Sequence, residues 1–193
     1  MGNPQAAAER SMFILTEQTP NPASLKFLPG REVMPSGTAN FPDADTARRS
    51  PLAERLFAMP EVKGVFFGAD FITVTKAEEA DWYRLKPAIL AVIMEHFTSG
   101  RAVLTAPLEG ETESGEDDSE TVAQIKELLE TRVRPAVAQD GGDITFCDYE
   151  DGVVYLHMQG SCSGCPSSLA TLKAGIENML RYYIPEVSEV RAV

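Results

Sequence analysis

The chain has 193 residues and a formal net charge of -12, from 17 Lys and Arg against 29 Asp and Glu. A surface with this excess of negative charge repels phosphate, so we expect no binding to nucleic acid and none to an anionic membrane. No apolar stretch approaches the roughly 20 residues that a membrane-spanning helix needs. Three cysteines are too few for a disulfide scaffold, and 44% hydrophobic residues are typical of a globular protein with one or two domains.

The negative charge is concentrated in one short segment. Residues 108–120, LEGETESGEDDSE, carry seven acidic residues and no basic one. The segment has a single apolar residue, so it cannot bury enough surface to offset its ordering entropy. We therefore predict two small domains, residues 12–107 and residues 119–193, joined by a flexible acidic linker at residues 108–118.

The N-terminal half predicts a small α+β domain. Alternating apolar residues predict four short strands, at residues 12–16, 24–28, 62–67 and 71–75. The sequence TPNP at residues 19–22 predicts the turn between the first two strands. The last two strands are separated by Gly68-Ala69-Asp70 and should form a hairpin. Residues 34–49 are rich in Pro, Gly and Asp, and they predict a loop.

Two helices are predicted in the same half. Ser50 can cap the first helix, with Pro51 at its first helical position. The second helix spans residues 81–97, and Pro87 should kink it or split off its first turns. Near its end, His96 is expected to be a cap or surface histidine. This half of the chain has no cysteine, so it offers little chemistry of its own.

The C-terminal half predicts five elements in the order α-β-β-α-β. Apolar residues with a helical period predict one helix over residues 121–137, capped by Ser119 or Asp118. The other elements are a hairpin of two strands, a second helix and a last strand, at residues 144–149, 153–158, 166–183 and 186–193. The predicted fold class of the whole chain is therefore α+β, with two small domains.

The reactive chemistry of the chain lies in the CxxC motif at residues 162–165. Pro166 belongs at the first position of the following helix, which places Cys165 at or beside its N-cap. Backbone N–H groups and the positive end of the helix dipole lower the pKa of a thiol at such a place. We therefore expect Cys162 and Cys165 to hold a metal or a cluster as thiolates.

The remaining candidate ligands do not complete a set with the motif. Matching the inner faces of the hairpin puts Phe146 opposite Leu156 and Cys147 opposite Tyr155, far from the CxxC motif along the hairpin. His157 is expected on the outer face of its strand, as a surface histidine. A zinc ion or a cubane cluster usually needs four protein ligands, and two chains meeting about a two-fold axis would supply them.

These residues resemble the NifU-like (Nfu-type) family of iron–sulfur cluster scaffolds and carriers. The C-terminal half carries the segments RPAVAQDGGDITF, VYLHMQGSCSGCPSS and TLKAGIENMLRYYIPEV. The N-terminal half is similar to the accessory Nfu N-terminal domain at TPNPASLKFLPG, SPLAERLF, VKGVFFGADFITVTK and DWYRLKPAI. The resemblance covers nearly all of the chain except residues 1–11 and the acidic segment.

The resemblance implies a carrier rather than an enzyme. It implies a 4Fe–4S cluster that is bridged between two protomers, held by Cys162 and Cys165 of each, and transferred to apo-proteins. The expected partners are apo iron–sulfur client enzymes, upstream assembly factors and a second copy of this chain, as a homodimer when the cluster is loaded. Cys147 does not fall in the ligand motif of the family.

Two other functions and the compartment remain to be considered. A CxxC motif before a helix N-terminus is also the geometry of thiol–disulfide oxidoreductases, although a hairpin and not a βαβ unit precedes it here. The same thiolates could hold a zinc ion that clips two chains together. Reduced thiolates and clusters need a reducing compartment. Because residues 1–11 lack the features of a transit peptide, we expect the cytoplasm, with the mitochondrial matrix as the alternative.

Overall fold

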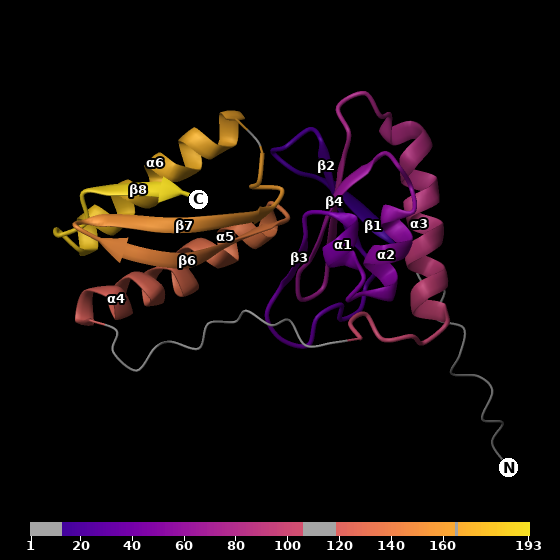
Figure 1. Cartoon of the computed structure of the whole chain (residues 1–193), viewed down its shortest axis with the longest axis horizontal. Helices are drawn as coiled ribbons and strands as arrows, with labels where there is room; N and C mark the ends of the chain where they lie inside the picture. Colours follow the sequence, from indigo (N-terminus) through magenta and orange to yellow (C-terminus); the bar gives the residue numbers. More distant parts are fainter. Residues whose placement is uncertain (1–12, 106–118, 165) are drawn as a thin grey trace, which may run out of the picture.

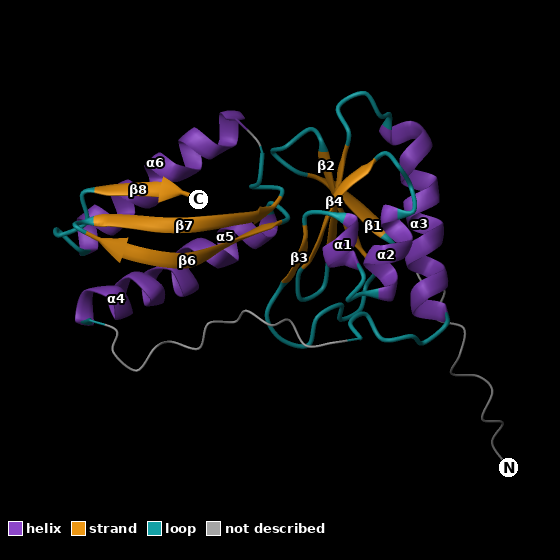
Figure 2. Cartoon of the chain, in the orientation of Figure 1, coloured by secondary structure: helices purple, strands orange, loops and turns teal. Residues whose placement is uncertain are grey.

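The computed structural model describes residues 13–105, 119–164 and 166–193. It contains two separate β-sheets, each with its own helices and its own hydrophobic core (Figure 1; Figure 2). The α+β class and the two domains are therefore as predicted. The predicted linker, residues 108–118, lies outside the described residues. No helix in the described part of the chain is long and apolar enough to cross a membrane.

The N-terminal domain is built on a five-stranded antiparallel sheet with the order β1-β2-β5-β4-β3. Its strands are β1 Leu15–Gln18, β2 Ser24–Leu28, β3 Ala39–Phe41, β4 Val62–Phe67 and β5 Ile72–Lys76. The predicted hairpin is formed by β4 and β5, which are adjacent in the sheet. Three of the four predicted strands are confirmed, the first begins at Leu15 rather than at residue 12, and β3 is an addition.

The prediction of a loop over residues 34–49 is wrong in part. The structure has β3 and the short helix α1, Ala44–Ala47, within this segment. Strand β3 pairs with β4 at the edge of the sheet and buries Ala39 and Phe41. Asp43 caps α1 by accepting a hydrogen bond of 2.8 Å from Thr46 N. Elements of three and four residues are too short to give a periodicity that a sequence can reveal.

Two longer helices, α2 Pro51–Phe57 and α3 Trp82–Thr98, cover one face of this sheet. Ser50 Oγ accepts a hydrogen bond of 3.0 Å from Ala53 N, so the predicted cap of α2 is confirmed. Helix α3 runs through Pro87 as one element, and the predicted division of the helix is wrong. Proline removes one hydrogen bond near the exposed start of α3, where water can satisfy the carbonyl group.

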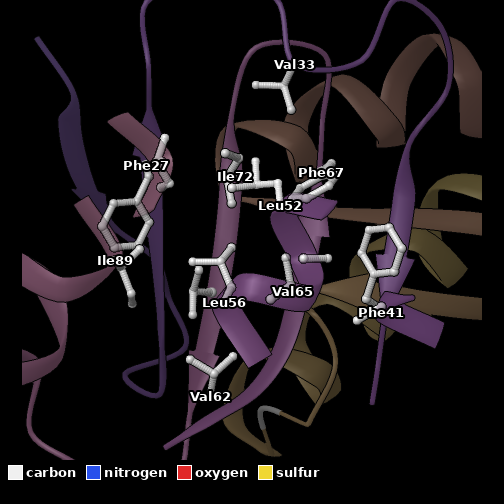
Figure 3. Close-up of a cluster of buried hydrophobic side chains, with 14 of the residues drawn as sticks. Phe27, Val33, Phe41, Leu52, Leu56, Val62, Val65, Phe67, Ile72 and Ile89 are labelled. Carbon is white, nitrogen blue, oxygen red and sulfur yellow. The ribbon is translucent and has the colours of Figure 1, made fainter. Parts of the chain in front are cut away.

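The core of the N-terminal domain lies between the sheet and these helices (Figure 3). Alternate residues of the central strands point into it, as the period of a strand requires. Burial of each large apolar side chain contributes about 1.5–3 kcal/mol to the hydrophobic driving force. Fully buried members of this core are Phe27, Phe41, Leu52, Leu56, Phe67, Ile72, Ile89 and Ile93.

The C-terminal domain places its helices against one face of a three-stranded sheet with the order β6-β7-β8. Strands β6 and β7 are antiparallel, and β8 is parallel to β7. The elements are α4 Glu120–Leu128, η1 Leu129–Val133, α5 Arg134–Gln139, β6 Gly142–Glu150, β7 Val153–Gly160, α6 Pro166–Tyr183 and β8 Glu189–Ala192. The predicted order α-β-β-α-β is confirmed when α4, η1 and α5 are counted as one helical segment.

That helical segment is not the uniform α-helix predicted over residues 121–137. Its middle, η1, is a π-helical segment, in which Arg134 N donates to the carbonyl group of Leu129, five residues earlier. Pro135 has no N–H and cannot donate to the carbonyl group four residues earlier. The interruption of the ladder at Pro135 accounts for the wider turn. Ile125, Leu129, Val133 and Val137 still share one buried face.

His96 is buried, which corrects its prediction as a cap or surface residue. It follows Ile89 and Ile93 on the inner stripe of α3, and its exposed fraction is 0%. Neither ring nitrogen has a hydrogen-bond partner among the described residues. Burial, together with the positive charges of Arg55 and Arg101, lowers the pKa of His96. The structure therefore holds this histidine neutral.

The buried neutral His96 should make the stability of the N-terminal domain depend on pH. The unfolded chain binds a proton near pH 6.5, whereas the folded domain resists protonation to lower pH, so stability falls as the pH drops below about 6.5. We expect the His96→Phe variant to lose this part of the pH dependence. Urea unfolding between about pH 7.5 and 5.5, followed by the fluorescence of the single tryptophan, Trp82, measures it.

The other histidine provides the control. His157 is exposed in the C-terminal domain, and the His157→Gln variant should keep the pH dependence of the wild type. An equal pH dependence in the wild type and in His96→Phe would contradict the assignment.

Candidate functional site

Residues 162–164 of the CxxC motif lie in the turn that follows β7, at the end of the β6–β7 hairpin where β6 begins (Figure 1). Helix α6 begins at Pro166, as predicted. Ser163 N donates to the carbonyl oxygen of Gly160 at 3.1 Å, and Ser161 N donates to that of Gly141 at 3.2 Å. The turn is therefore bonded to the start of β6 as well as to the end of β7. Cys165 lies outside the described residues.

Cys162 points into the C-terminal domain. Only 7% of the residue is exposed, and it belongs to the hydrophobic core of that domain. A Cβ atom on Gly142 would lie 2.6 Å from Cys162 Sγ and 2.8 Å from the carbonyl oxygen of Gln159. Gly142 therefore leaves the space that the sulfur of Cys162 occupies.

Two glycines give the turn its shape. Gly160 and Gly164 have φ angles of 65° and 76°, in the left-handed region that favours glycine. A Cβ atom on Gly160 would also lie 2.6 Å from the carbonyl oxygen of Gly141. The first glycine thus allows β7 to approach the start of β6 closely, and the second reverses the chain before α6.

The structure does not bring Cys147 or His157 to the motif. Phe146 pairs with Leu156 as predicted, but Tyr155 pairs with Asp148, because Cys147 is the extra residue of a β-bulge. The predicted pairing of Cys147 with Tyr155 is therefore wrong, although Cys147 does lie away from the motif. Partial burial raises the pKa of the Cys147 thiol, and the negative charge of Asp148 acts in the same direction. His157 is exposed on the outer face, as predicted.

The motif end of the hairpin contacts the N-terminal domain, which sequence reasoning missed. Asn21 Nδ2 lies 3.3 Å from the carbonyl oxygen of Ser161 and 3.4 Å from that of Ser163. Thr73 Oγ1 donates to the carbonyl oxygen of Gly141 at 2.7 Å. Asn21 belongs to the TPNP segment, for which the sequence predicts only a turn. The one signal in the sequence was the polar residues on the outer positions of β2 and β5.

A buried carboxylate supports the same end of the hairpin. Asp143, 3% exposed, binds Arg134 through two hydrogen bonds of 2.8 Å. Its carboxylate also accepts hydrogen bonds from Ile144 N at 2.8 Å and from Thr38 Oγ1 of the N-terminal domain at 2.9 Å. Charge-assisted bonds of this kind offset the cost of burying the carboxylate. They hold the start of β6, against which Cys162 packs.

The described part of one chain does not assemble a full set of metal ligands. No group of three or more His, Cys, Asp or Glu side chains is close enough to hold a metal ion among the described residues. Cys162 is placed in the turn, and Cys165 follows it by three positions in the sequence. These two soft sulfur donors suit iron–sulfur clusters and zinc, and both usually need four ligands.

The sequence matches two family models. Residues 14–100 match the model of the scaffold protein Nfu/NifU N-terminal domain. Residues 125–191 match the model of the NifU-like domain. The two matches fall on the N-terminal and C-terminal domains of the structure.

Several relatives are similar over almost the whole chain. A protein of Drosophila sechellia named NFU1 iron-sulfur cluster scaffold homolog, mitochondrial, is 60% identical over 189 residues, covering 97% of this chain and 67% of the relative. The proteins of the same name from Drosophila simulans and Drosophila ananassae are 60% and 56% identical. A solution structure of a NifU-like protein from Saccharomyces cerevisiae aligns with 55% of this chain and 96% of its own, at 24% identity and a TM-score of 0.48.

Two glycine substitutions in the C-terminal domain should change its stability in opposite directions. Gly142→Ala should destabilise the C-terminal domain by about 1–3 kcal/mol, because its new methyl group collides with Cys162 and with the backbone. Gly175 lies in α6 with no atom within 4 Å of an added Cβ. Gly175→Ala should stabilise the helix by about 0.5–1 kcal/mol.

Native-state hydrogen exchange of the β6 and β7 amides reports the stability of the C-terminal domain separately from the rest of the chain. Slower exchange in Gly175→Ala and faster exchange in Gly142→Ala are expected. Unchanged exchange in Gly142→Ala would contradict the prediction, because the turn would then accommodate the methyl group without loss of stability.

Proposed function

The chain belongs to the Nfu/NifU scaffold family, and from that membership we propose that it binds an iron–sulfur cluster and passes it to other proteins. The observation that carries the proposal is the CxxC motif, in the turn between β7 and α6 of a domain that matches the NifU-like family. The proposed cargo is a 4Fe–4S cluster. Its proposed ligands are Cys162 and Cys165 from each of two chains.

Sharing the cluster between two chains gives it a physical route of release. A chain that supplies two of four thiolates binds the cargo only in a homodimer, so separation of the protomers removes half of the ligands at once. In transfer, each iron–sulfur bond to Cys162 or Cys165 is replaced by a bond to a thiolate of the recipient. The proton of each recipient thiol passes to the departing cysteine, and no electrons are exchanged.

The proposed partners follow from this exchange. They are apo iron–sulfur client enzymes that present thiols, and upstream factors that supply the cluster. The protein would act as a carrier rather than an enzyme, with residues 12–107 as a recognition domain, residues 119–193 as the cluster-binding domain and residues 108–118 as the linker. The relatives are named mitochondrial, which supports the mitochondrial matrix and not the cytoplasm that residues 1–11 suggested.

Anaerobic reconstitution with iron and sulfide tests the ligand set. The wild-type protein should become brown, bind about two iron atoms per chain and elute as a dimer. Cys162→Ala and Cys165→Ala should each abolish cluster binding, because the pair of chains then retains only two of the four thiolates. Iron, acid-labile sulfide and molecular mass per chain are the quantities to measure.

Cys147→Ala is the matched control and should bind as much cluster as the wild type. A colourless monomer after reconstitution would contradict the proposal. Zinc without acid-labile sulfide in the dimer would select the zinc clip. Thiol–disulfide exchange catalysed by an iron-free monomer would select the oxidoreductase.

A further inference from the structure

The central strands of the N-terminal sheet bury residues on both faces of the sheet. Residues Phe27, Ile72 and Phe67 face the core under α2 and α3, so their neighbours along the strands point the other way. These neighbours are buried too, with Phe66 and Thr73 each 1% exposed, although neither side chain belongs to the apolar core of that domain. Strands β4 and β5 contact β7 on this side. One end of the C-terminal domain therefore covers part of the second face of the N-terminal sheet (Figure 1).

This interface is centred on the glycines at the motif end of the hairpin. A Cβ atom on Gly160 would lie 3.0 Å from Cδ1 of Phe66. A Cβ atom on Gly141 would lie 2.8 Å from Thr73 Oγ1, which donates to the carbonyl oxygen of the same glycine. Lys26 Nζ donates to the carbonyl oxygen of Gln139 at 3.2 Å. The N-terminal sheet thus rests directly on the backbone that frames the CxxC turn.

Asn21 is the residue that reaches the turn itself. Its Oδ1 accepts a hydrogen bond of 3.0 Å from Ala23 N, which fixes the side chain within its own turn. Its Nδ2 donates to the carbonyl oxygens of Ser161 and Ser163, one on each side of Cys162. The side chain is buried, with only 5% of the residue exposed. An amide held at one end and bonded at the other restrains the turn.

That conformation turns Cys162 away from solvent. The sulfur packs against Gly142 inside the C-terminal domain, whereas a ligand to a cluster shared by two chains has to present its sulfur at the surface. The turn must therefore change conformation when the cluster is bound. The carbonyl groups of Ser161 and Ser163 belong to the segment that has to move, and Asn21 restrains both.

We propose that the docked N-terminal domain is a latch, in which Asn21 holds the CxxC turn closed with Cys162 buried, and that undocking this domain makes the motif competent for its cargo. The inference rests on the proposed function. Because docking and cluster binding require different states of the turn, each disfavours the other by the same factor. A cluster donor that binds the second face of the N-terminal sheet would therefore open the turn for loading, and docking of this domain again would favour release.

The Asn21→Asp variant should remove the contact with the CxxC turn while keeping the turn to which Asn21 itself belongs. A carboxylate still accepts the hydrogen bond from Ala23 N, but it cannot donate to the carbonyl groups of Ser161 and Ser163. Alkylation of the full-length apo-protein by iodoacetamide, resolved by mass spectrometry for each cysteine, reports opening of the turn. We expect Cys162 to react about tenfold faster in the variant, since two hydrogen bonds are lost, one of them buried and the other partly buried. The exposed Cys147 should react at its original rate and serves as the internal reference.

Two further variants complete the experiment. Asn178→Asp makes the same chemical change at an exposed position on α6 and should leave the rate at Cys162 unchanged. Thr73→Val removes the hydrogen bond to Gly141 with little change in shape, and it should also raise the rate at Cys162. Far-UV circular dichroism and Trp82 fluorescence establish that each variant remains folded. An unchanged Cys162 rate in both Asn21→Asp and Thr73→Val would overturn the proposal.

The alkylation readout needs no cluster, so it separates the latch from the proposed function. Faster alkylation in Asn21→Asp together with faster cluster loading would support both. Faster alkylation in a chain that never binds a cluster would keep the latch and remove the proposed cargo. Normal cluster loading with no change in alkylation would keep the cargo and remove the latch.

Discussion

The close approach of two backbone segments, where β6 begins and β7 ends, is the constraint on which the rest of the structure depends. Gly142 pairs with Gly160 there, and neither position has room for a side chain. The space left on one side receives the sulfur of Cys162. The space on the other side receives Phe66 of the N-terminal sheet. One pair of glycines thus sets both the packing of the motif and the contact between the domains.

Several buried polar interactions meet at the same end of the hairpin. Asp143 binds Arg134 in its own domain and Thr38 in the other, and Thr73 binds the carbonyl group of Gly141. An unpaired buried carboxylate or carbonyl group costs more than the bond itself gains. Separation of the domains therefore has to hydrate several groups together, which favours one docked arrangement over a range of partial ones.

Local patterns predicted most of the elements but not how the two domains meet. The caps at Ser50 and the helix start at Pro166 depend on neighbours within a few residues, so they could be recognised in the sequence. The bulge at Cys147 depends on a partner strand, and the burial of His96 depends on a whole core. The docking contact of Asn21 joins residues 140 positions apart in the chain. No periodicity in a sequence reports a contact between two folded surfaces.

The parallel pairing of β7 with β8 has a consequence for the order of folding. Strand β8 ends at Ala192, and it pairs with β7 only after α6 has crossed the sheet. The C-terminal sheet is therefore completed only after residues 189–192 have been synthesised, when the strands of the N-terminal domain have already been made. Domains fold as units during synthesis, the N-terminal one first. The folded N-terminal sheet then provides a preformed surface against which the β6–β7 hairpin docks.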